Sequence, residues 1–501
     1  MHNASEYILG GKAVVGIEFG STRIKAVMIG DDFSPLAMGA HDWENSLVDG
    51  YWTYSLEEIE SGLRDAYAKM AADAKAKYGV EVKRIAALGI SGMMHGYLPF
   101  DEDGNLLAAF RTWRNTTTAA AAAELSELFK FNVPQRWSVS HFRQALLDNE
   151  AHAGKVRSLT TLAGYVHMRL GGDNALGVGE ASGMFPIDPA TGNYDAAMLA
   201  KFKEKTGVDI APLLPKVLAA GEKAGVLSSE GAAWLDPSGN LEPGALLAPP
   251  EGDAGTGMVA TNAVRVKTGN VSAGTSVFAM IVLENAMKGY YPEIDVVTTP
   301  TGKAVAMVHC NNCTNEINAW VQNILGGDYK SLFAESLKGD KDCGGVVVVP
   351  FLSGEPVAGA DEALLKVVRN PASRFTLANF MRAQIYSAFV SLKIGMEILS
   401  KENVETVSLM AHGGIFKDKG VAQQYLADAL KTPVTCMATA TEGGPWGMAV
   451  LAAYALDRRG LSLEDYLDKF VFASSASDTL DPDPQGVAGF DAYTANFKAA
   501  L

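Results

Sequence analysis

Cysteine is scarce in this sequence, and the few cysteines do not form a recognisable metal-binding pattern. Four occur among 501 residues, and only Cys310 and Cys313 are close together. Neither a second pair nor a histidine cluster accompanies them, so the pattern of a zinc site is missing. A redox Cys-x-x-Cys is the alternative, but the surrounding sequence is unlike a thioredoxin-type unit, which favours buried thiols without a functional role.

Long apolar runs and an excess of positive charge are also missing. Runs such as Gly345–Pro350 are far shorter than the roughly 20 residues that span a membrane. The opening MHNASEYILGGKAVVGIEFG lacks the basic segment, apolar run and cleavage site of a secretory signal. The formal net charge of −15 should make the surface repel nucleic acid and anionic lipid. We therefore expect a cytoplasmic protein with neither nucleic acid nor membrane as a partner.

Several enzyme signatures are absent as well. The sequence contains no Gly-x-Gly-x-x-Gly after a strand, no Walker A motif, no His-Glu-x-x-His and no Gly-x-Ser-x-Gly. These absences remove support for a nicotinamide dehydrogenase, a P-loop nucleotide hydrolase, a zinc protease and an α/β-hydrolase. The hydrophobic share of 48% and the charged share of 20% are typical of a globular enzyme.

The length predicts at least two domains, and the first half opens on a regular series of elements. Apolar runs and their spacing predict three strands, a helix and a further strand. The helix has Ser55 as its N-cap, Glu58 at the capping-box position and Gly79 after its end. The predicted elements are strands at 13–18, 23–29 and 36–40, a helix at 55–78 and a strand at 84–90.

The second half begins with the same kind of series. The helix predicted over 377–399 has apolar residues at helical spacing, which indicates a stripe that faces the core. The predicted elements are strands at 264–267, within 271–281 and at 304–309, this helix, a strand at 404–410, a helix at 421–430, a strand at 434–437 and a helix at 446–456. A duplicated nucleotide-binding fold divided into 12–262 and 263–501 would leave this pattern.

Each half also contains a turn rich in glycine, serine and threonine. The first is Gly20-Ser21-Thr22 and the second is Gly274-Thr275-Ser276. Backbone N–H groups and small hydroxyls in such turns can surround a polyphosphate, because glycine permits close approach. A plain hairpin turn is the alternative for either one alone, but their presence in both halves favours two phosphate-binding turns.

The order of these motifs resembles the FGGY carbohydrate kinase family, and within it the xylulokinase and ribulokinase branch. The resemblance runs from about Val14 to about Ala453 and ends on the stretch Glu442–Ala449. It implies an α/β fold of the duplicated actin-like (ribonuclease H-like) ATPase type. An amino-terminal sugar-binding and catalytic domain and a carboxyl-terminal ATP-binding domain would flank a catalytic cleft, with ATP and Mg²⁺ as cofactors.

The resemblance implies that Asp253, in the stretch Pro250–Gly257, is the general base. Phosphoryl transfer to an alcohol needs a carboxylate that accepts the hydroxyl proton. Without the resemblance, an aspartate in a glycine-rich loop would more often be a turn residue. The resemblance likewise implies a metal contact for Glu18, where the family usually has aspartate. The longer side chain allows contact with the metal through water.

The residues implied as sugar contacts are Met94, His95, Asn115 and Asp253. Core packing is the alternative for the Met-His pair, and a surface loop is the alternative for the family-like stretch around Glu180. The chain departs from the xylulokinase pattern at Met93, Asn115, Thr117 and Ala254. Since an amide both donates and accepts hydrogen bonds, whereas a carboxylate only accepts them, the recognised hydroxyl pattern should differ.

The resemblance also implies a set of ATP contacts in both halves. They are Gly20, Ser21, Thr22, Gly274, Thr275, Gly413, Gly414 and Lys417.

The predicted reaction is the ATP-dependent phosphorylation of a ketopentose, D-xylulose or L-ribulose. One alternative is a kinase for another small sugar or polyol, such as another pentulose, glycerol or gluconate. The other is an actin-like ATPase or nucleotide sensor without sugar chemistry. Met94, His95 and Asp253 argue against the latter, because they would have no purpose there. A homodimer is the base-rate expectation for the assembly.

Overall fold

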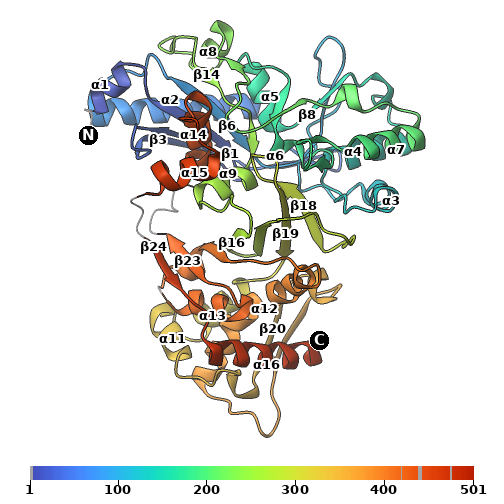
Figure 1. Ribbon diagram of the computed structural model, residues 1–501, viewed down its shortest axis with the longest axis vertical. Helices are drawn as coiled ribbons and strands as arrows, with labels where there is room; N and C mark the ends of the chain where they lie inside the picture. Colours follow the sequence, from blue (N-terminus) through green and yellow to red (C-terminus); the bar gives the residue numbers. More distant parts are fainter. Residues whose placement is uncertain (1–3, 419, 438–442, 474–476) are drawn as a thin grey trace. The chain divides into compact units, whose positions relative to one another are not determined.

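The computed structural model describes residues 4–418, 420–437, 443–473 and 477–501. The described residues form two compact units, one from the ranges 1–262, 297–304 and 441–474, the other from 263–296, 305–440 and 475–501. Each unit contains a mixed sheet with helices packed against it, so the chain has the expected α/β class (Figure 1). Glu442, the first residue of the stretch Glu442–Ala449, lies outside the described residues.

The sheet of the first unit has the strand order β13-β14-β6-β1-β2-β3, and β15 also pairs with β6. Strands β1, β2 and β3 form an antiparallel meander, whereas β6 runs parallel to β1, and both β14 and β15 run parallel to β6. The strands are β1 (Val14–Phe19), β2 (Arg23–Ile29), β3 (Pro35–Asp42), β6 (Ala87–Gly92), β13 (Gly225–Val226), β14 (Leu246–Leu247) and β15 (Glu251–Gly252).

Helix α2 (Leu56–Tyr78) confirms the predicted first helix and both of its ends. The Ser55 hydroxyl accepts the Glu58 N–H, and the Glu58 carboxylate accepts the Ser55 N–H, which completes the capping box. Gly79 ends the helix in the left-handed conformation at φ 71°. The helix packs on β2 and β3 through one apolar face. That face comprises Ile59, Leu63, Ala66, Tyr67, Met70 and Ala74.

The other elements of the first unit are short hairpins and helices. The strands are β4 (Ser46–Val48), β5 (Tyr51–Thr53), β7 (Leu98–Phe100), β8 (Ser158–Thr160), β9 (Ala175–Gly177), β10 (Ile187–Asp188), β11 (Asn193–Tyr194) and β12 (Lys216–Leu218). The helices are α1 (Ala4–Leu9), α3 (Ala119–Phe129), α4 (Ser138–Leu147), α5 (Leu162–Arg169), α6 (Val178–Ala181), α7 (Ala196–Thr206), α8 (Ser229–Leu235), α9 (Asp253–Ala260), α14 (Gly443–Leu456) and α15 (Leu463–Tyr466).

The sheet of the second unit repeats the topology of the first. Its order is β18-β19-β17-β16-β22-β23-β24, in which β16 and β17 form an antiparallel hairpin and β22 runs parallel to β16. The hairpin β16–β17 thus corresponds to β1–β2, and β22 corresponds to β6. The strands are β16 (Thr268–Ala273), β17 (Val277–Val282), β18 (Ile294–Thr298), β19 (Ala304–Cys310), β22 (Ser408–His412), β23 (Val434–Met437) and β24 (Ser477–Leu480). This repeat is the duplicated actin-like fold.

The remaining elements of the second unit include the long helix α12 (Leu377–Lys401), which confirms the predicted core helix. Most of its predicted apolar stripe is buried, although Leu377 at its start is exposed. The others are β20 (Val347–Phe351), β21 (Leu364–Val368), α10 (Asn315–Asn323), α11 (Tyr329–Ser336), α13 (Val421–Leu430) and α16 (Pro484–Ala500).

Two strand predictions in this half differ from the structure. The strand predicted at 264–267 is wrong, because β16 begins only at Thr268. Lys267, just before it, has φ 66°, a left-handed conformation that interrupts a strand. Val264 is buried, which explains the apolar signal without a strand. The later strand, β22, begins at Ser408 rather than at 404.

Helix α14, although late in the sequence, packs on β1, β6 and α9 of the first unit (Figure 1, red among blue strands). Glycines allow this close packing. A Cβ atom at Gly16 would lie 2.1 Å from the Pro445 carbonyl oxygen, and one at Gly447 would lie 2.2 Å from the Thr256 carbonyl oxygen. Residues 297–304 join the same unit, partly because the Thr298 N–H donates to the Ser182 hydroxyl at 3.0 Å.

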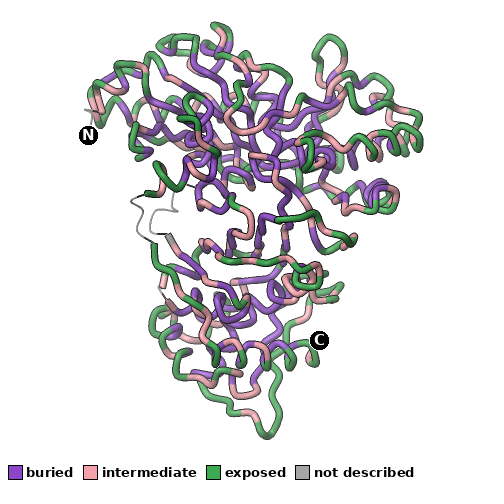
Figure 2. The backbone as a smooth tube through the Cα atoms, in the orientation of Figure 1, coloured by how far each residue is buried: buried purple, intermediate pink, exposed green. Residues whose placement is uncertain are grey.

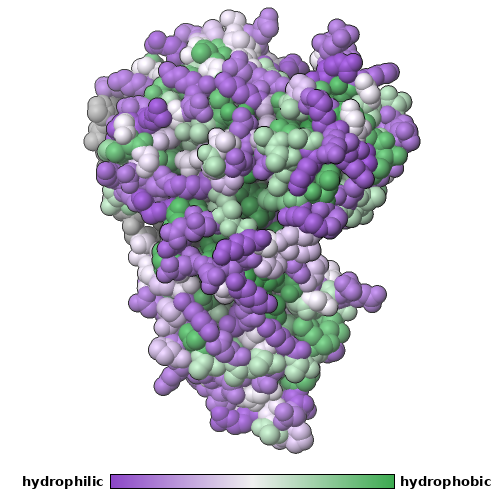
Figure 3. Space-filling model, turned by 45° about the vertical axis from the view of Figure 1, so that its right-hand side comes forward, coloured by the Kyte–Doolittle hydropathy of each residue, from purple (hydrophilic) through white to green (hydrophobic). Residues whose placement is uncertain are grey.

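The buried residues of each unit include those of its central strands. Figure 2 shows the central strands of each unit in the buried colour, and the face in Figure 3 is largely hydrophilic. In the part of the chain that the structure describes, no helix combines the length and the apolar character needed to cross a membrane.

Substitution of Gly16 by alanine should destabilise the fold, because its Cβ would collide with the backbone of α14. We expect a loss of about 1–3 kcal/mol in the free energy of unfolding and a lower Tm by calorimetry. The control is Gly154→Ala, whose Cβ would have no heavy atom within 4 Å. An unchanged Tm for Gly16→Ala would contradict the close packing of α14 on β1.

Candidate active site

Polar side chains gather where three parallel strands of the first unit end. Glu18 on β1 is in register with Ser91 on β6, which is in register with Glu251 on β15. Each of these residues lies one position before the end of its strand. Asp253 follows β15 directly as the first residue of α9. The carboxyl ends of parallel strands are where α/β proteins bind ligands.

Asp253 is held by backbone groups through one of its two carboxylate oxygens. Its Oδ1 accepts the N–H of Ala254 at 2.9 Å and the N–H of Met94 at 3.3 Å. The Thr256 hydroxyl braces the start of α9, since it donates to the Gly252 carbonyl at 3.2 Å and lies 3.1 Å from the Ser91 hydroxyl. Asp253 is exposed to solvent, yet the surrounding protein raises its pKa by desolvation.

Glu18 lies close enough to Asp253 for their charges to interact. Burial and the negative charge of Asp253 raise the pKa of Glu18 to about 7, and Lys25 opposes this shift. A Cβ atom at Gly444 would lie 2.0 Å from the Glu18 Oε1, so the absence of a side chain there makes room for the carboxylate. The structure thus brings together the predicted base and the predicted metal contact.

The fit of Mg²⁺ to this place can be judged from the donor atoms. No group of three or more histidine, cysteine, aspartate or glutamate side chains within the described ranges could hold a metal ion. Mg²⁺ usually binds through one or two carboxylates together with substrate phosphates and water, rather than in a cage made by the protein alone. The hard carboxylate oxygens of Glu18, beside Asp253, fit that arrangement.

His95 presents a hydrogen-bond acceptor at this edge. Its Nδ1 lies 3.0 Å from the Gly183 carbonyl oxygen, which only accepts, so Nδ1 carries the hydrogen and the neutral ring keeps its lone pair on Nε2. Burial lowers the pKa of His95 to about 3, with Arg136 acting in the same direction. Trp137 stacks on the ring with centroids 6.1 Å apart.

Asn115 is bound to the backbone of its own neighbourhood. Its Oδ1 accepts the Trp52 N–H at 2.8 Å, and its Nδ2 donates to the carbonyl oxygens of Trp52 at 2.9 Å and Thr112 at 3.0 Å. The bonds to Trp52 fix β5 to the segment that contains Asn115, and the bond to Thr112 holds that segment itself. The amide rather than a carboxylate suits this position, because the Trp52 backbone offers both a donor and an acceptor.

Two buried glutamates behind Asp253 belong to the same region. The sequence left Glu180 open between a site stretch and a surface loop, and it did not assign a role to Glu251. The Glu251 carboxylate accepts the N–H groups of Gly179 at 3.3 Å and Glu180 at 3.0 Å. Burial raises the pKa of Glu251 to about 8 against these hydrogen bonds. Glu180 itself is fully buried. The only signal in the sequence was their position inside the family-like stretches.

The first glycine-rich turn is held by its carbonyl groups. The Trp43 indole N–H donates to the Gly20 carbonyl at 2.8 Å, and the Tyr54 hydroxyl donates to the Ser21 carbonyl at 2.6 Å. Trp43 and Tyr54 stack with centroids 3.9 Å apart. Thr22 is exposed and Ser21 is partly exposed.

The second turn, in the other unit, is held in the same way. The N–H of Cys313 donates to the Thr275 carbonyl at 3.0 Å, and the Thr314 hydroxyl donates to the Gly274 carbonyl at 2.7 Å. Gly274 and Thr275 are exposed. A Cβ atom at Gly413 would lie 2.0 Å from the Ala273 carbonyl oxygen, so Gly413 packs against the end of β16.

A cavity of about 320 Å³ lies beside this second turn. Three of the predicted ATP contacts line it, namely Gly274, Gly414 and Lys417. Tyr329 and Phe333 from α11 supply aromatic surface, and the Tyr329 hydroxyl donates to the Asn318 side-chain oxygen at 2.9 Å. The size and the mixed polar and aromatic lining suit a small organic ligand.

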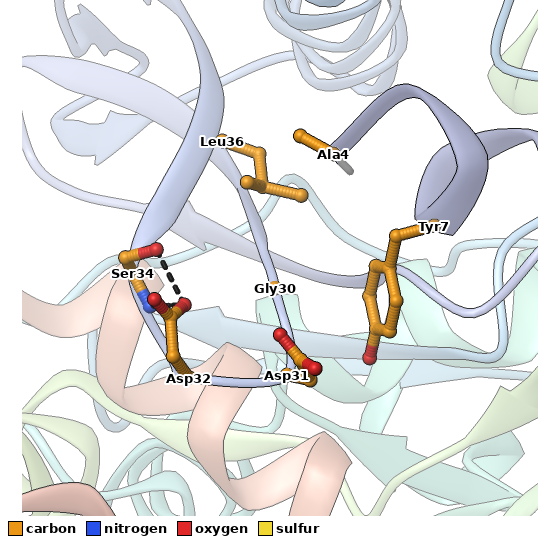
Figure 4. Close-up of a pocket in the computed structure, with 7 residues that line it drawn as sticks. All are labelled: Ala4, Tyr7, Gly30, Asp31, Asp32, Ser34 and Leu36. Carbon is orange, nitrogen blue, oxygen red and sulfur yellow. Dashed lines mark hydrogen bonds between the residues drawn. The ribbon is translucent and has the colours of Figure 1, made fainter. Parts of the chain in front are cut away.

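A second cavity, of about 360 Å³, contains none of the predicted site residues. It lies between α1 and the turn that joins β2 to β3, and its lining includes Tyr7, Asp31 and Asp32 (Figure 4). The Asp32 carboxylate accepts hydrogen bonds from the Ser34 hydroxyl and the Ser34 N–H.

The cysteines have the environment expected of structural thiols. Cys310, Cys313 and Cys343 are buried, and Cys436 is partly exposed. Burial raises the pKa of Cys313 to about 12 and that of Cys436 to about 11, which disfavours the reactive thiolate.

Two models of protein domains match the chain. The amino-terminal domain of the FGGY family of carbohydrate kinases matches residues 13–236, and the carboxyl-terminal domain of that family matches residues 269–456. The chain belongs to the FGGY family of carbohydrate kinases. Kinases of this family use ATP, and the alternative of an actin-like ATPase without sugar chemistry is set aside.

Individual relatives of this kinase are distant. The xylulose kinase of Haemophilus influenzae is 23% identical over 464 residues, which cover 88% of this chain and 90% of the relative. A ligand-bound xylulose kinase and a gluconate kinase, both from Lactobacillus acidophilus, have similar structures with TM-scores of 0.82 and 0.81. Each is 16% identical, and each alignment covers 98% of this chain and 97% of the other. The shared fold therefore does not identify the sugar.

The buried Glu251 should make the stability of the kinase depend on pH. Its folded pKa of about 8 lies above the ordinary value of 4.5, so its stabilising contribution is complete below pH 4.5 and is lost as the pH rises through 8. The wild-type kinase loses about 1.4 kcal/mol in its free energy of unfolding per pH unit in this range. Glu251→Gln has no ionisable group at this position and should not show this loss. We expect the wild-type Tm to fall relative to that of the variant between about pH 5 and pH 8. Parallel Tm curves would show that Glu251 is ionised in the folded kinase.

Proposed function

We propose that this kinase transfers the γ-phosphoryl group of ATP to a hydroxyl of a ketopentose, D-xylulose or L-ribulose, with Asp253 as the general base. The observation that carries the proposal is the pairing of an accessible carboxylate, Asp253, with His95 at the carboxyl ends of β1, β6 and β15. The xylulose kinase of Haemophilus influenzae, similar over most of the chain, supports a ketopentose.

Asp253 has the geometry that a base for an alcohol needs. Its two hydrogen bonds from backbone N–H groups both go to Oδ1, so we assign Oδ2 to the hydroxyl of the sugar. A carboxylate at this position takes the proton as the hydroxyl oxygen attacks the phosphorus atom. Exposure of Asp253 lets the sugar reach it.

His95 supplies a second point of sugar recognition. Because its Nδ1–H is bound to the Gly183 carbonyl, its Nε2 accepts a hydrogen bond from a sugar hydroxyl. Its low pKa keeps this acceptor available at every physiological pH. Met94 joins the two groups, since its backbone N–H binds Asp253 and His95 follows it directly. For Asn115 we propose an indirect role in the sugar site, in which its hydrogen bonds hold β5 in place.

Candidate ATP contacts occur in each unit by itself. We assign the adenosine to the cavity beside Gly414 and Lys417, where Tyr329 and Phe333 offer aromatic surface. In each unit an exposed turn is a candidate phosphate contact, because it offers small hydroxyls and backbone N–H groups. The turn is Gly20-Ser21-Thr22 in the first unit and Gly274-Thr275 in the second. Glu18 would hold Mg²⁺ directly or through water. Bound Mg²⁺ neutralises the charge on the phosphates.

The sugar can be identified by measuring ADP release from the kinase with Mg·ATP against D-xylulose, L-xylulose, D-ribulose, L-ribulose, glycerol and gluconate. We expect one ketopentose to give the highest kcat/KM, because the relative that is similar over most of the chain is a xylulose kinase. A preference for glycerol or gluconate would overturn the ketopentose assignment while leaving the kinase assignment intact.

Replacement of Asp253 by asparagine should abolish most of the turnover, because an amide cannot accept the proton. A general base contributes about 10²–10⁴-fold, so we expect kcat to fall by that factor. The dissociation constant of ATP, measured by calorimetry, should not change, since Asp253 belongs to the sugar side. Turnover near the wild-type value would show that another group is the base.

A further inference from the structure

Glu180, on α6, is a buried acid without a hydrogen-bond partner. Its side chain is fully buried, and among the described residues neither carboxyl oxygen has a partner. The hydroxyl of Tyr194, on β11, is also buried without a partner, and it lies near enough for the two groups to interact. Unpaired buried polar groups are rare in proteins, since each costs free energy of folding, so the presence of this acid points to a role in the site.

The charges around Glu180 favour its uncharged form. Burial is the largest cause that raises the pKa of Glu180 well above its usual value, and the negative charges of Asp253 and Glu251 act in the same direction. The Thr161 hydroxyl acts in the opposite direction, without the geometry of a hydrogen bond. Glu251 differs from Glu180, because backbone N–H groups solvate its carboxylate. The two neighbouring acids are therefore accommodated in different ways.

Contacts connect Glu180 to the segment that carries Asp253. A Cβ atom at Gly252 would lie 2.5 Å from the Glu180 Oε2 and 2.3 Å from the Met94 Cγ. Gly252 thus packs between the Glu180 carboxyl group and the Met94 side chain, directly before Asp253.

The turn after α6 makes a second set of contacts, with Met94 and His95. The Gly183 carbonyl accepts the His95 Nδ1–H, and a Cβ atom at Gly183 would lie 3.0 Å from the Met94 Cε. The segment from Glu180 to Gly183 therefore touches Met94, His95 and Gly252.

We propose that Glu180 is a positioning residue for the phosphoryl transfer: its carboxyl group, packed against Gly252, holds Asp253 in register with Met94 and His95. The proposal rests on the function of Asp253 proposed above. Glu180 has no exposed surface, so we assign it a role through its neighbours rather than a contact with the sugar. It acts through the backbone of Gly252, whose displacement would move the Asp253 carboxylate away from the sugar hydroxyl.

Three variants test whether catalysis depends on the packing of the Glu180 carboxyl group or on its charge. Glu180→Gln keeps the shape of the side chain, Glu180→Asp withdraws the carboxyl group by one methylene, and Glu180→Ala removes it. A displacement of about 1 Å can cost about 10²-fold in rate, so we expect kcat to fall by about 10–100-fold in the aspartate and alanine variants. The glutamine variant should keep kcat near that of the wild type. Glu57→Asp, an exposed glutamate shortened in the same way, is the control.

Two further measurements distinguish positioning from a general loss of structure. The KM for ATP should stay the same in all variants, because the ATP contacts lie elsewhere. The pH dependence of kcat/KM should be the same in Glu180→Gln and the wild type, since no charge is removed.

The outcomes that would overturn the proposal are equally specific. A wild-type kcat in Glu180→Asp would show that the packing of the carboxyl group does not matter. A shift of the ascending limb to lower pH in Glu180→Gln would show that Glu180 is charged, because removal of a negative charge lowers the pKa of Asp253. A wild-type protein that phosphorylates no sugar would instead refute the proposed function.

Discussion

Burial of acidic side chains at one sheet edge is the constraint on which the site of the first unit depends. Strands β1, β6 and β15 run parallel, so Glu18, Glu251 and Asp253 end up at the same edge. Like charges at short distance repel strongly where water is excluded. Burial raises the pKa of Glu18, Glu180, Glu251 and Asp253, and backbone N–H groups oppose this rise at Glu251. Asp253 is the exposed residue of the four. The exposed carboxylate, Asp253, is the one that we propose as the base.

A late helix of the chain also borders this edge. Helix α14 lies on β1, β6 and α9, and Gly444 near its start leaves room for the Glu18 carboxylate. Close packing at Gly16 and Gly447 fixes α14 against β1 and α9. Since α9 begins at Asp253, residues far apart in the chain together determine where the proposed base lies.

Sequence patterns predicted the elements well and the contacts within the site less well. Capping residues and apolar spacing gave α2 and α12, because local signals control helix ends and faces. The strand predicted at Val264 is wrong, because a buried residue outside a sheet gives the same apolar signal in sequence as a residue in a buried strand. Asp253 and His95 came from a family resemblance, and no local pattern shows that Glu180 is buried beside Gly252. Such a contact depends on packing between distant segments.

Transfer of phosphate to a sugar at Asp253 can be observed by ³¹P NMR of the kinase with Mg·ATP and its best ketopentose. ADP release alone does not distinguish transfer from hydrolysis. We expect the γ-phosphate signal to be replaced by a sugar phosphomonoester in an amount equal to the ADP formed. Conversion of the γ-phosphate to inorganic phosphate alone, with no ester signal, would contradict the transfer.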